Sequence, residues 1–96
     1  MLFTVINTDR PAHLDLRMAT RAEHLAFLDT EVSRIVNGGA MLDADGKPCG
    51  SVLIIDAADQ AEAEAFAAAD PYAKAGLFAS SIVRRFNSVF KDGKRA

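Results

Sequence analysis

The chain has 96 residues, of which 50% are hydrophobic and 25% are charged. This length and balance are typical of one small globular domain, and they exclude a disordered chain and a multidomain enzyme. The 11 basic and 13 acidic residues give a net charge of −2, which argues against a nucleic-acid-binding protein. We therefore expect a single domain over residues 1–96 with no nucleic-acid partner.

The sequence shows no recognisable membrane-spanning or secretory segment. The longest run of large apolar residues, Val52 to Ile55, is far shorter than the roughly 20 residues of a transmembrane helix or the roughly 7 to 15 of a signal-peptide core. We therefore expect a cytoplasmic protein without a membrane partner.

Cys49 is the only cysteine. It cannot form an internal disulfide, and no neighbouring histidine activates it, so we expect a structural thiol.

The first two predicted elements are a strand and a long helix. Residues 1–7, MLFTVIN, are rich in β-branched and aromatic residues and carry apolar side chains on both faces, which is typical of a strand. From about Leu14 to Val36, apolar residues recur at steps of three, four and seven, which predicts a helix with one buried stripe. The stripe consists of Leu14, Met18, Leu25, Leu28, Val32 and Ile35. We expect Asn37-Gly38-Gly39 to end this helix, because glycine supplies a left-handed cap.

A hairpin and a second helix are predicted next. The stretches Ala40 to Leu42 and Ser51 to Asp56 bracket the segment DADGKPCG, whose Asp-Gly pair is a turn signal. The second of these strands, SVLIID, again has apolar residues on both faces. Asp59 and Glu62 resemble a capping box, and the alanine-rich run that follows them to Ala69 favours a helix.

The last third of the chain predicts a helical turn and a final strand. Asp70-Pro71 ends the second helix, because the residue before proline is pushed out of the helical region. The same pair can begin a short helix, PYAKA, with Asp70 as its N-cap and Gly76 as its terminator. Residues 81–90 alternate between two mixed faces, which indicates a strand. The tail, residues 91–96, has nothing to bury, and we expect it to be frayed.

The element order is β-α-β-β-α-β, which predicts an α+β protein with the ferredoxin-like arrangement of two helices on one face of a four-stranded antiparallel sheet. The strands that are apolar on both faces would leave an apolar surface on the face without helices. Stacking of two such sheets would cover this surface and enlarge a thin core. We therefore expect a homodimer.

Charged residues occupy the inward face of the long helix. Arg17, Arg21 and His24 all lie on this face over the first half of the helix, where apolar residues are expected. Buried positive charge without partners is costly, so this part of the helix either overhangs the sheet or lines a polar cleft. In a simpler alternative, the arginines reach solvent at the rim and His24 is a hydrogen-bonded histidine at the core edge. Asp70 likewise has a simpler alternative role as an N-cap.

We expect neither a metal ion nor a cofactor. His13 has no partner at the spacing of a metal site. Gly38-Gly39 follows a helix rather than opening one, so it does not form a dinucleotide- or phosphate-binding loop. The sequence also offers no evident covalent nucleophile.

Several short motifs occur together along the chain. They are Arg17 followed by RAEHL, Gly50-Ser51 opening an apolar strand, DPYAKAGLF over residues 70–78, and the closing VRRFNSVF. The combination of RxxH with DPY and a following AG resembles the YCII-related (YciI-like) family of small bacterial proteins, and the resemblance extends over nearly the whole chain. It implies one YCII-related domain and a dimeric α/β barrel of ferredoxin-like units.

The resemblance also implies an active site. A His and an Asp are the proposed catalytic pair of this family, and the motifs assign these roles to His24 and Asp70. The resemblance places Ser51 and Arg21 near the cleft, while Arg17 shares the helix face and Tyr72 belongs to the DPY motif. We therefore expect the substrate-binding residues to be Arg17, Arg21, Ser51 and Tyr72.

A His-Asp pair suits proton transfer. An imidazole exchanges protons near neutral pH, and a carboxylate bonded to its other nitrogen fixes the tautomer and stabilises the protonated ring. Arg21 would supply positive charge to an anionic or enolate-like oxygen. The compatible reactions are isomerisation, elimination or hydration of a small, anionic organic molecule. The resemblance adds that some relatives are lyase-type enzymes, including a dehydrochlorinase of chlorinated hydroxyquinols.

Two other functions stay open at this point. A non-catalytic small-ligand-binding or accessory protein would use the same cleft without turnover. A pure oligomerisation module would have no pocket around His24.

Overall fold

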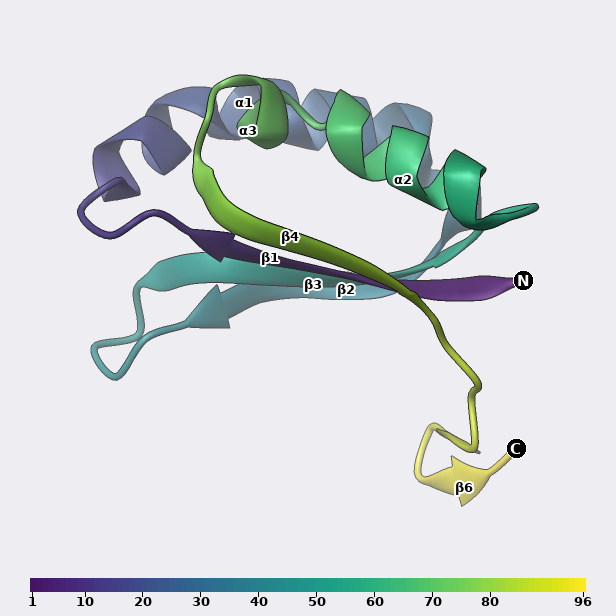
Figure 1. Ribbon diagram of the computed structural model, residues 1–96. Helices are drawn as coiled ribbons and strands as arrows, with labels where there is room; N and C mark the ends of the chain where they lie inside the picture. Colours follow the sequence, from purple (N-terminus) through teal and green to yellow (C-terminus); the bar gives the residue numbers. More distant parts are fainter.

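The computed structural model describes residues 1–96 and contains a four-stranded antiparallel sheet with helices on one face (Figure 1). The elements in chain order are β1 (Leu2–Asp9), α1 (Leu14–Thr30), the 3₁₀ helix η1 (Val32–Arg34), β2 (Ile35–Leu42), β3 (Pro48–Asp56), α2 (Gln60–Ala69), α3 (Pro71–Lys74), β4 (Phe78–Arg85), β5 (Phe90–Lys91) and β6 (Lys94–Arg95). The predicted α+β class is confirmed. None of the helices is both long and apolar enough to span a membrane.

The order of strands in the sheet is β2-β3-β1-β4, so each helical connection passes over one intervening strand. This is the predicted ferredoxin-like arrangement. Val5 of β1 lies opposite Leu53 of β3 and Val83 of β4, and all three side chains are buried beneath the helices. Phe3 and Phe66 belong to the same core cluster. Full burial of each such side chain contributes about 1.5–3 kcal/mol to stability.

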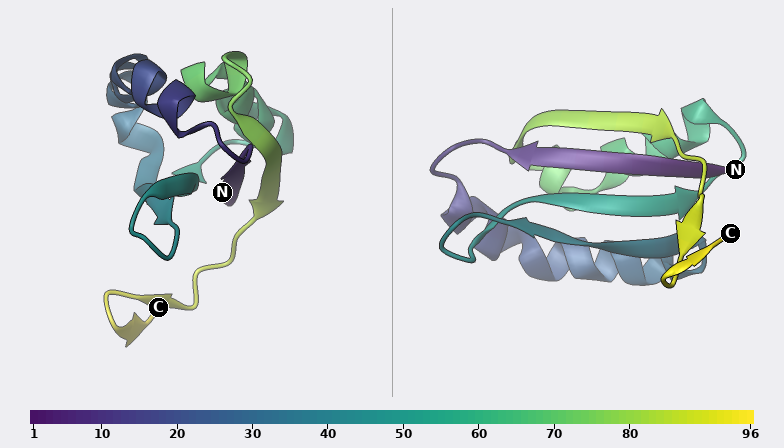
Figure 2. Two further views of the ribbon diagram at one scale, coloured as in Figure 1. Left: turned by 90° about the vertical axis from the view of Figure 1, so that its left-hand side faces the viewer. Right: turned by 90° about the horizontal axis from the view of Figure 1, so that it is seen from below.

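No helix covers the opposite face of the sheet (Figure 2). This face carries apolar side chains. These side chains alternate with the buried ones along the strands and include Leu2, Ile6, Val52, Ile54 and Ile82. Ile82 is 41% exposed. The two apolar faces predicted for the first and third strands are therefore confirmed. They leave the open sheet face as an apolar surface of the kind that marks an interaction site.

Helix α1 is shorter than predicted, because it ends at Thr30 rather than near Val36. The hydroxyl of Thr30 donates to the carbonyl of Phe27 at 2.6 Å, and the N–H of Glu31 donates to the carbonyl of Leu28 in a tightened last turn. The β-branched residues that follow then enter a strand. Pairing with β3 outweighs the helical spacing on which the prediction rested.

The glycines that were predicted to cap this helix lie inside β2 instead. Neither Gly38 nor Gly39 has a positive φ, so neither forms a left-handed cap. Gly38 lies opposite Leu53 of β3, and a Cβ atom at Gly38 would collide with Cδ2 of that side chain. A side chain at this position would therefore have to displace the buried side chain of Leu53.

The buried face of α1 also differs from the predicted apolar stripe. Its buried residues are Arg17, Thr20 and His24, whereas Met18 is 55% exposed and Leu25 is 40% exposed. Charged and titratable side chains are buried in proteins when they find partners, and Arg17 and His24 each contact a carboxylate. The first half of α1 therefore turns a polar face inward.

The remaining strands differ from the predictions only in their bounds. Strands β2 and β3 are both longer than predicted, and Gly46 in the turn between them has a φ of 79°, as the predicted turn requires. Strand β4 covers residues 78–85 instead of 81–90. Arg85 lies opposite Phe3, near the start of β1, and the N–H of the next residue, Phe86, still donates to the carbonyl of Leu2 at 3.0 Å.

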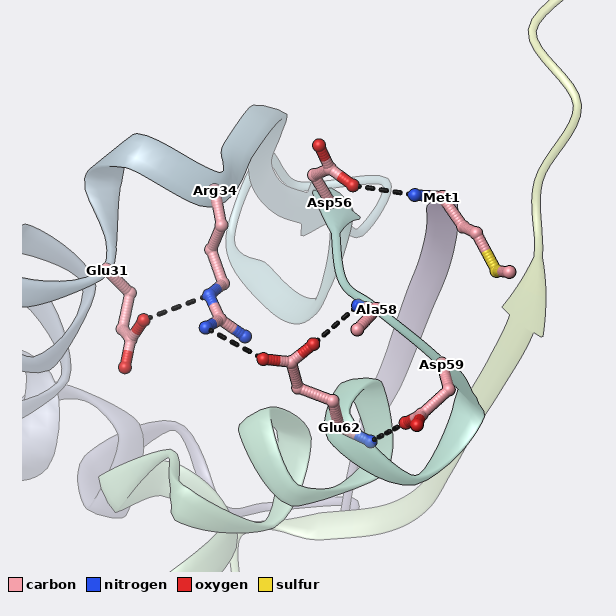
Figure 3. Close-up of polar contacts among 7 residues, drawn as sticks. All are labelled: Met1, Glu31, Arg34, Asp56, Ala58, Asp59 and Glu62. Carbon is pink, nitrogen blue, oxygen red and sulfur yellow. Dashed lines mark hydrogen bonds and ion pairs between the residues drawn. The ribbon is translucent and has the colours of Figure 1, made fainter.

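Asp59 and Glu62 cap the start of α2 as the sequence predicts, except that the return bond of the capping box goes to the residue before the N-cap (Figure 3). The carboxylate of Asp59 accepts the N–H of Glu62 at 2.8 Å, and the Glu62 side chain reaches back to the N–H of Ala58. Glu62 also pairs with Arg34 at 3.4 Å, and Arg34 pairs with Glu31 at 3.1 Å. This cluster connects the segment after α1 to the beginning of α2.

The chain beyond β4 leaves the sheet and ends away from the body of the molecule (Figure 1). Its last residues, which we expected to be frayed, include a two-stranded hairpin of β5 and β6. All four hairpin residues are exposed, and Phe90 is 71% exposed. The tail therefore presents an unpaired aromatic side chain to solvent.

Candidate active site

His24 and Asp70 are 46 positions apart in the sequence and form a direct hydrogen bond. His24 lies on the inward face of α1, and Asp70 is the residue that precedes α3. The distance between His24 Nδ1 and Asp70 Oδ1 is 2.8 Å. The two residues are only 8% and 2% exposed, so water competes little for this contact.

Asp70 also serves as the N-cap of α3. Its Oδ1 atom accepts the N–H of Tyr72 at 2.9 Å, and Pro71 occupies the first helical position, as predicted from the sequence. The same oxygen therefore bonds both His24 and the backbone of α3. The two roles of Asp70 are compatible, because the N-cap hydrogen bond holds the carboxylate in the position from which it contacts His24.

The hydrogen bond to Asp70 determines the tautomer of His24. An ionised carboxylate only accepts hydrogen bonds, so the histidine atom that faces it is a protonated Nδ1. Nε2 of His24 forms no hydrogen bond within the chain. No fully buried side-chain nitrogen or oxygen lacks a partner, so Nε2 is not sealed inside the protein. Nε2 is therefore the ring atom that is open to proton exchange.

Tyr72 contacts both His24 and Arg17. The rings of His24 and Tyr72 are stacked, with centroids 4.0 Å apart and planes inclined by 16°. Cζ of Arg17 lies 4.7 Å from the centroid of the Tyr72 ring. Arg17 in turn binds both carboxylate oxygens of Asp9, at 2.6 and 3.0 Å. This bidentate contact offsets the cost of burying the guanidinium and fixes the row Asp9-Arg17-Tyr72-His24.

Burial and nearby charges shift the pKa values of Tyr72 and Arg17. Burial raises the pKa of the Tyr72 phenol above its usual value, and the nearby cations of Arg17 and Arg21 partly oppose the rise. Tyr72 is therefore neutral at physiological pH. Burial by itself lowers the pKa of Arg17, but the hydrogen bonds and charge of Asp9 outweigh burial, so the pKa of Arg17 is raised.

A cavity of about 290 Å³ lies between α1 and the strands β2 and β3. On the sheet side, its wall includes Gly38, which has no side chain, and the small residues Ala40 and Ser51, so space is left beneath the helix. On the helical side it is lined by Arg17, Arg21, His24, Leu25, Leu28 and Tyr72. The size approaches that of pockets for small organic ligands. A cavity at His24 argues against a pure oligomerisation module.

Arg21 is the unpaired cation of this cavity. It lines the cavity and is exposed, and it forms no ion pair or hydrogen bond within the chain. Arg17 also lines the cavity, but its charge is paired with Asp9. No carboxylate neutralises the positive charge of Arg21 at the cavity, and this charge favours an anionic ligand.

The sequence alone left the orientation of Ser51 open, and the structure turns this residue toward the cavity. Ser51 is 4% exposed, and its Oγ atom accepts a hydrogen bond from Nδ2 of Asn7 at 3.2 Å. Oδ1 of Asn7 accepts a hydrogen bond from the hydroxyl of Ser81 at 2.6 Å. The predicted residues of the cavity are thus all brought together, and Ser51 is connected to a buried asparagine behind it.

Sequence reasoning missed two residues that support this site, Asn7 and Asp9. Asn7 could have been found, because it occupies the inward position that follows Phe3 and Val5 in β1, where another apolar residue is expected. Asp9 lies in the polar end of the same strand, and nothing in the local pattern identifies Arg17 as its partner.

The structure contains no group of three or more His, Cys, Asp or Glu side chains that could together hold a metal ion. Cys49 is a half-buried free thiol that lies outside the His24 cavity. The functional groups that line this cavity are the imidazole of His24, the guanidinium groups of Arg17 and Arg21, the hydroxyl of Ser51 and the phenol of Tyr72.

Comparison with known proteins identifies related sequences over almost the whole chain. The family model of the YCII-related domain matches residues 1–87. The chain is 31% identical to protein YciI of Escherichia coli O6:H1 (strain CFT073), over 94% of this chain and 100% of YciI. It is 32% identical to an uncharacterized protein of Haemophilus influenzae (strain Rd), with the same coverage.

Solved structures with the same fold include one with substantial sequence similarity. The 5-chloro-2-hydroxyhydroquinone dehydrochlorinase of Burkholderia phenoliruptrix AC1100, in complex with 2,5-dihydroxybenzoquinone, is 40% identical to this chain, with a TM-score of 0.86. The match covers 91% of this chain and 94% of the dehydrochlorinase. A NIPSNAP family protein of Agrobacterium tumefaciens C58 is 16% identical, with a TM-score of 0.56 over 97% and 94% of the two chains, and shares the fold alone.

Proposed function

The chain belongs to the YCII-related domain family, and we propose that it is a cofactor-independent enzyme in which His24 and Asp70 transfer protons on a small, anionic organic molecule. The reaction class that we assign is a lyase-type elimination, of which dehydrochlorination is one case. The similarity to the dehydrochlorinase described above supports this class.

The observation that carries the proposal is the 2.8 Å hydrogen bond between His24 Nδ1 and Asp70 Oδ1. It leaves Nε2 as the atom that accepts or donates a proton in the cavity. The buried carboxylate stabilises the imidazolium that forms when Nε2 takes up a proton. The stacked ring of Tyr72 limits rotation of the imidazole, so Nε2 keeps one direction during the reaction.

Loss of hydrogen chloride from a chlorinated hydroquinone is a redox-neutral reaction that this pair could catalyse. Two hydroxyl protons leave the substrate oxygens. One of them is returned to the ring carbon that bears chlorine. The carbon–chlorine bond then breaks, both electrons leave with chloride, and the second proton is released as the ring becomes a quinone. Nε2 of His24 would carry the proton from the hydroxyl oxygen to the ring carbon.

Arg21 and Ser51 are assigned to substrate binding. Removal of the first hydroxyl proton places negative charge on a substrate oxygen, and Arg21 is the cation of the cavity that has no other partner. Ser51 contributes a hydroxyl group from the sheet side. Arg17 and Tyr72 also line the cavity. Because Arg17 is already bound to Asp9, we assign to this pair mainly the positioning of His24.

The proposal is tested by chloride release from 5-chloro-2-hydroxyhydroquinone, here called the test substrate, under anaerobic conditions. Wild-type protein is expected to release chloride, and His24→Gln is expected to be about 100-fold to 10,000-fold slower, the usual range for a general acid-base group. His13→Gln is the matched control, because His13 is the only other histidine. Equal rates for His24→Gln and wild type would contradict the proposal.

The second candidate function is a non-catalytic ligand-binding or accessory protein that uses the same cavity. The cavity itself favours it, because the arrangement of Arg21 and Ser51 suits anion binding with or without turnover. Binding of 2,5-dihydroxybenzoquinone, here called the probe quinone, is followed by its visible absorbance. Binding that survives in His24→Ala, without chloride release by the wild type, would favour this second function.

We also propose that the protein is a homodimer in which the open sheet faces of two copies stack. The support is the exposed apolar surface of that face, to which Ile54 and Ile82 contribute. The aromatic residues of the tail add to it, because Phe86 is 40% exposed and Phe90 is 71% exposed. A cavity of about 530 Å³ separates this tail from the sheet. A stable interface would need to bury about 800 Å² on each copy.

A further inference from the structure

A chain of two side-chain hydrogen bonds, one buried and one part-buried, crosses three strands behind the cavity. Asn7 lies in the central strand β1, directly opposite Ser51 of β3 on one side and Ser81 of β4 on the other. Ser81 donates to Asn7 Oδ1 at 2.6 Å, and Asn7 Nδ2 donates to Ser51 Oγ at 3.2 Å. Ser51 faces the cavity, and Ser81 is exposed on the other side of Asn7.

The lengths of the two hydrogen bonds define the orientation of the Asn7 amide. A separation of 2.6 Å is typical of an O–H group that donates to an oxygen and is shorter than the usual N–H···O range. The separation of 3.2 Å lies within the N–H···O range. The carbonyl of Asn7 therefore faces Ser81 and its amino group faces Ser51. In the opposite orientation of the amide, Asn7 Nδ2 would lie 2.6 Å from Ser81 Oγ, which is too short for an N–H···O hydrogen bond.

This orientation determines what the Ser51 hydroxyl can do. A serine hydroxyl has one proton to donate and two lone pairs that accept. Because Asn7 Nδ2 is a donor only, it occupies a lone pair of Ser51 Oγ and leaves the hydroxyl proton free. Ser51 therefore keeps its proton for a group in the cavity, and an acceptor such as an anionic ligand oxygen fits that proton.

We propose that Asn7 is a positioning residue that orients the Ser51 hydroxyl as a hydrogen-bond donor to an anionic ligand oxygen in the cavity. The inference rests on the proposed function for its ligand class. Asn7 itself is 2% exposed and does not line the cavity, so it acts through Ser51. Its position continues the inward row of Phe3 and Val5, where an apolar side chain would fill the same place in the core.

A double-mutant cycle on binding of the probe quinone tests this role. Asn7→Leu keeps the branched shape of the side chain but removes the donor, and Ser51→Ala removes the hydroxyl. Each single substitution is expected to weaken binding by about threefold to tenfold, the range of one hydrogen bond. If Asn7 acts through Ser51, adding Asn7→Leu to Ser51→Ala changes the affinity by less than about twofold. Ser81→Ala is the control at the exposed end, because it leaves the Asn7–Ser51 contact in place.

A second measurement does not depend on ligand or on the folding of variants. In the wild-type protein, nuclear Overhauser contacts from the Asn7 side-chain amide protons are expected to the β-protons of Ser51 and not to those of Ser81. The reverse pattern would overturn the proposal. So would an affinity that Ser51→Ala leaves unchanged, a full effect of Asn7→Leu in the Ser51→Ala background, or no binding of the quinone by wild type. Chloride release is measured separately, so a protein that binds the quinone without turnover contradicts only the proposed catalysis.

Discussion

The imidazole ring of His24 is stacked on the phenol ring of Tyr72, with centroids 4.0 Å apart. Asp70, two residues before Tyr72, forms a hydrogen bond with Nδ1 of the same imidazole. The short helix α3 and its N-cap residue therefore contribute one contact to the face of the ring and one to its edge. The stacking contact and the hydrogen bond together restrain the His24 ring more than either would alone. Nε2 is then the only nitrogen of the ring without a hydrogen bond in the chain.

The titration of Tyr72 reports on this arrangement. Tyr72 is the only tyrosine and the chain has no tryptophan, so the absorbance of tyrosinate follows this residue alone. We expect a pKa above the ordinary phenol value of about 10. Because folding raises this pKa, its stabilising contribution is present below about pH 10 and is lost as the pH rises through the raised value.

Two substitutions should move this pKa in opposite directions. Arg21→Met removes a positive charge that lowers the pKa of Tyr72, so the pKa should rise further, and less so at high salt. Asp70→Asn removes a negative charge that raises the pKa, so the pKa should fall. Shifts of the same sign in the two variants would be inconsistent with the described geometry.

Arg21 should control the affinity of the cavity for anions. Arg21→Met is expected to weaken binding of the probe quinone by about tenfold at low ionic strength, since it removes a charged hydrogen-bond donor. The difference from wild type should shrink as salt is added. Lys47→Met, in the exposed turn between β2 and β3, is the control for net charge and should bind as the wild type does. Equal losses in the two variants would mean that net charge, and not Arg21, sets the affinity.

The two adjacent glycines of β2 should differ sharply in their tolerance of alanine. A Cβ atom at Gly38 collides with the side chain of Leu53, so Gly38→Ala should lower the free energy of unfolding by about 1–3 kcal/mol. A Cβ atom at Gly39 meets nothing within 4 Å, so Gly39→Ala should leave stability unchanged or slightly increased. Urea unfolding of both variants checks this pair, and a similar loss in both would show that the close contact is not the cause.

The open sheet face should hold two copies together. At micromolar concentration, wild-type protein is expected to sediment as a dimer and Ile82→Lys as a monomer, because the substitution would bury a charge in the interface. Met18→Lys is the matched control: Met18 is 55% exposed and Ile82 41%, but Met18 lies on α1, away from that face. A monomeric wild-type protein, or equal behaviour of the two variants, would disprove this interface.

The fold was largely predictable because its strands alternate clearly. Phe3 and Val5 point inward while Leu2 and Ile6 point outward, as the pattern of β1 indicates. The end of α1 was not predictable from spacing, because β-branched residues such as Ile35 satisfy a helical period and also favour strands. Only the pairing of that segment with β3, a long-range contact, decides between the two.

The site was predictable to a smaller extent. Helical spacing indicated that His24 and Arg17 face inward, but nothing local relates His24 to Asp70 across 46 positions. That pairing was anticipated only through the motifs shared with the YCII-related family. Asn7 and its contact with Ser51 depend on strand register, which a sequence does not specify well, because a shift of one residue reverses every side chain.

The dependence of catalysis on the His24–Asp70 contact is tested most directly by a double-mutant cycle on kcat for the test substrate. Asp70→Asn keeps the N-cap of α3, because asparagine caps helices as well as aspartate does, so the fold should be preserved. We expect Asp70→Asn to lower kcat by about tenfold to 100-fold and His24→Gln by more. The double variant should be no slower than His24→Gln alone. If the two losses multiply instead, Asp70 does not act through His24, and the proposed pair is wrong.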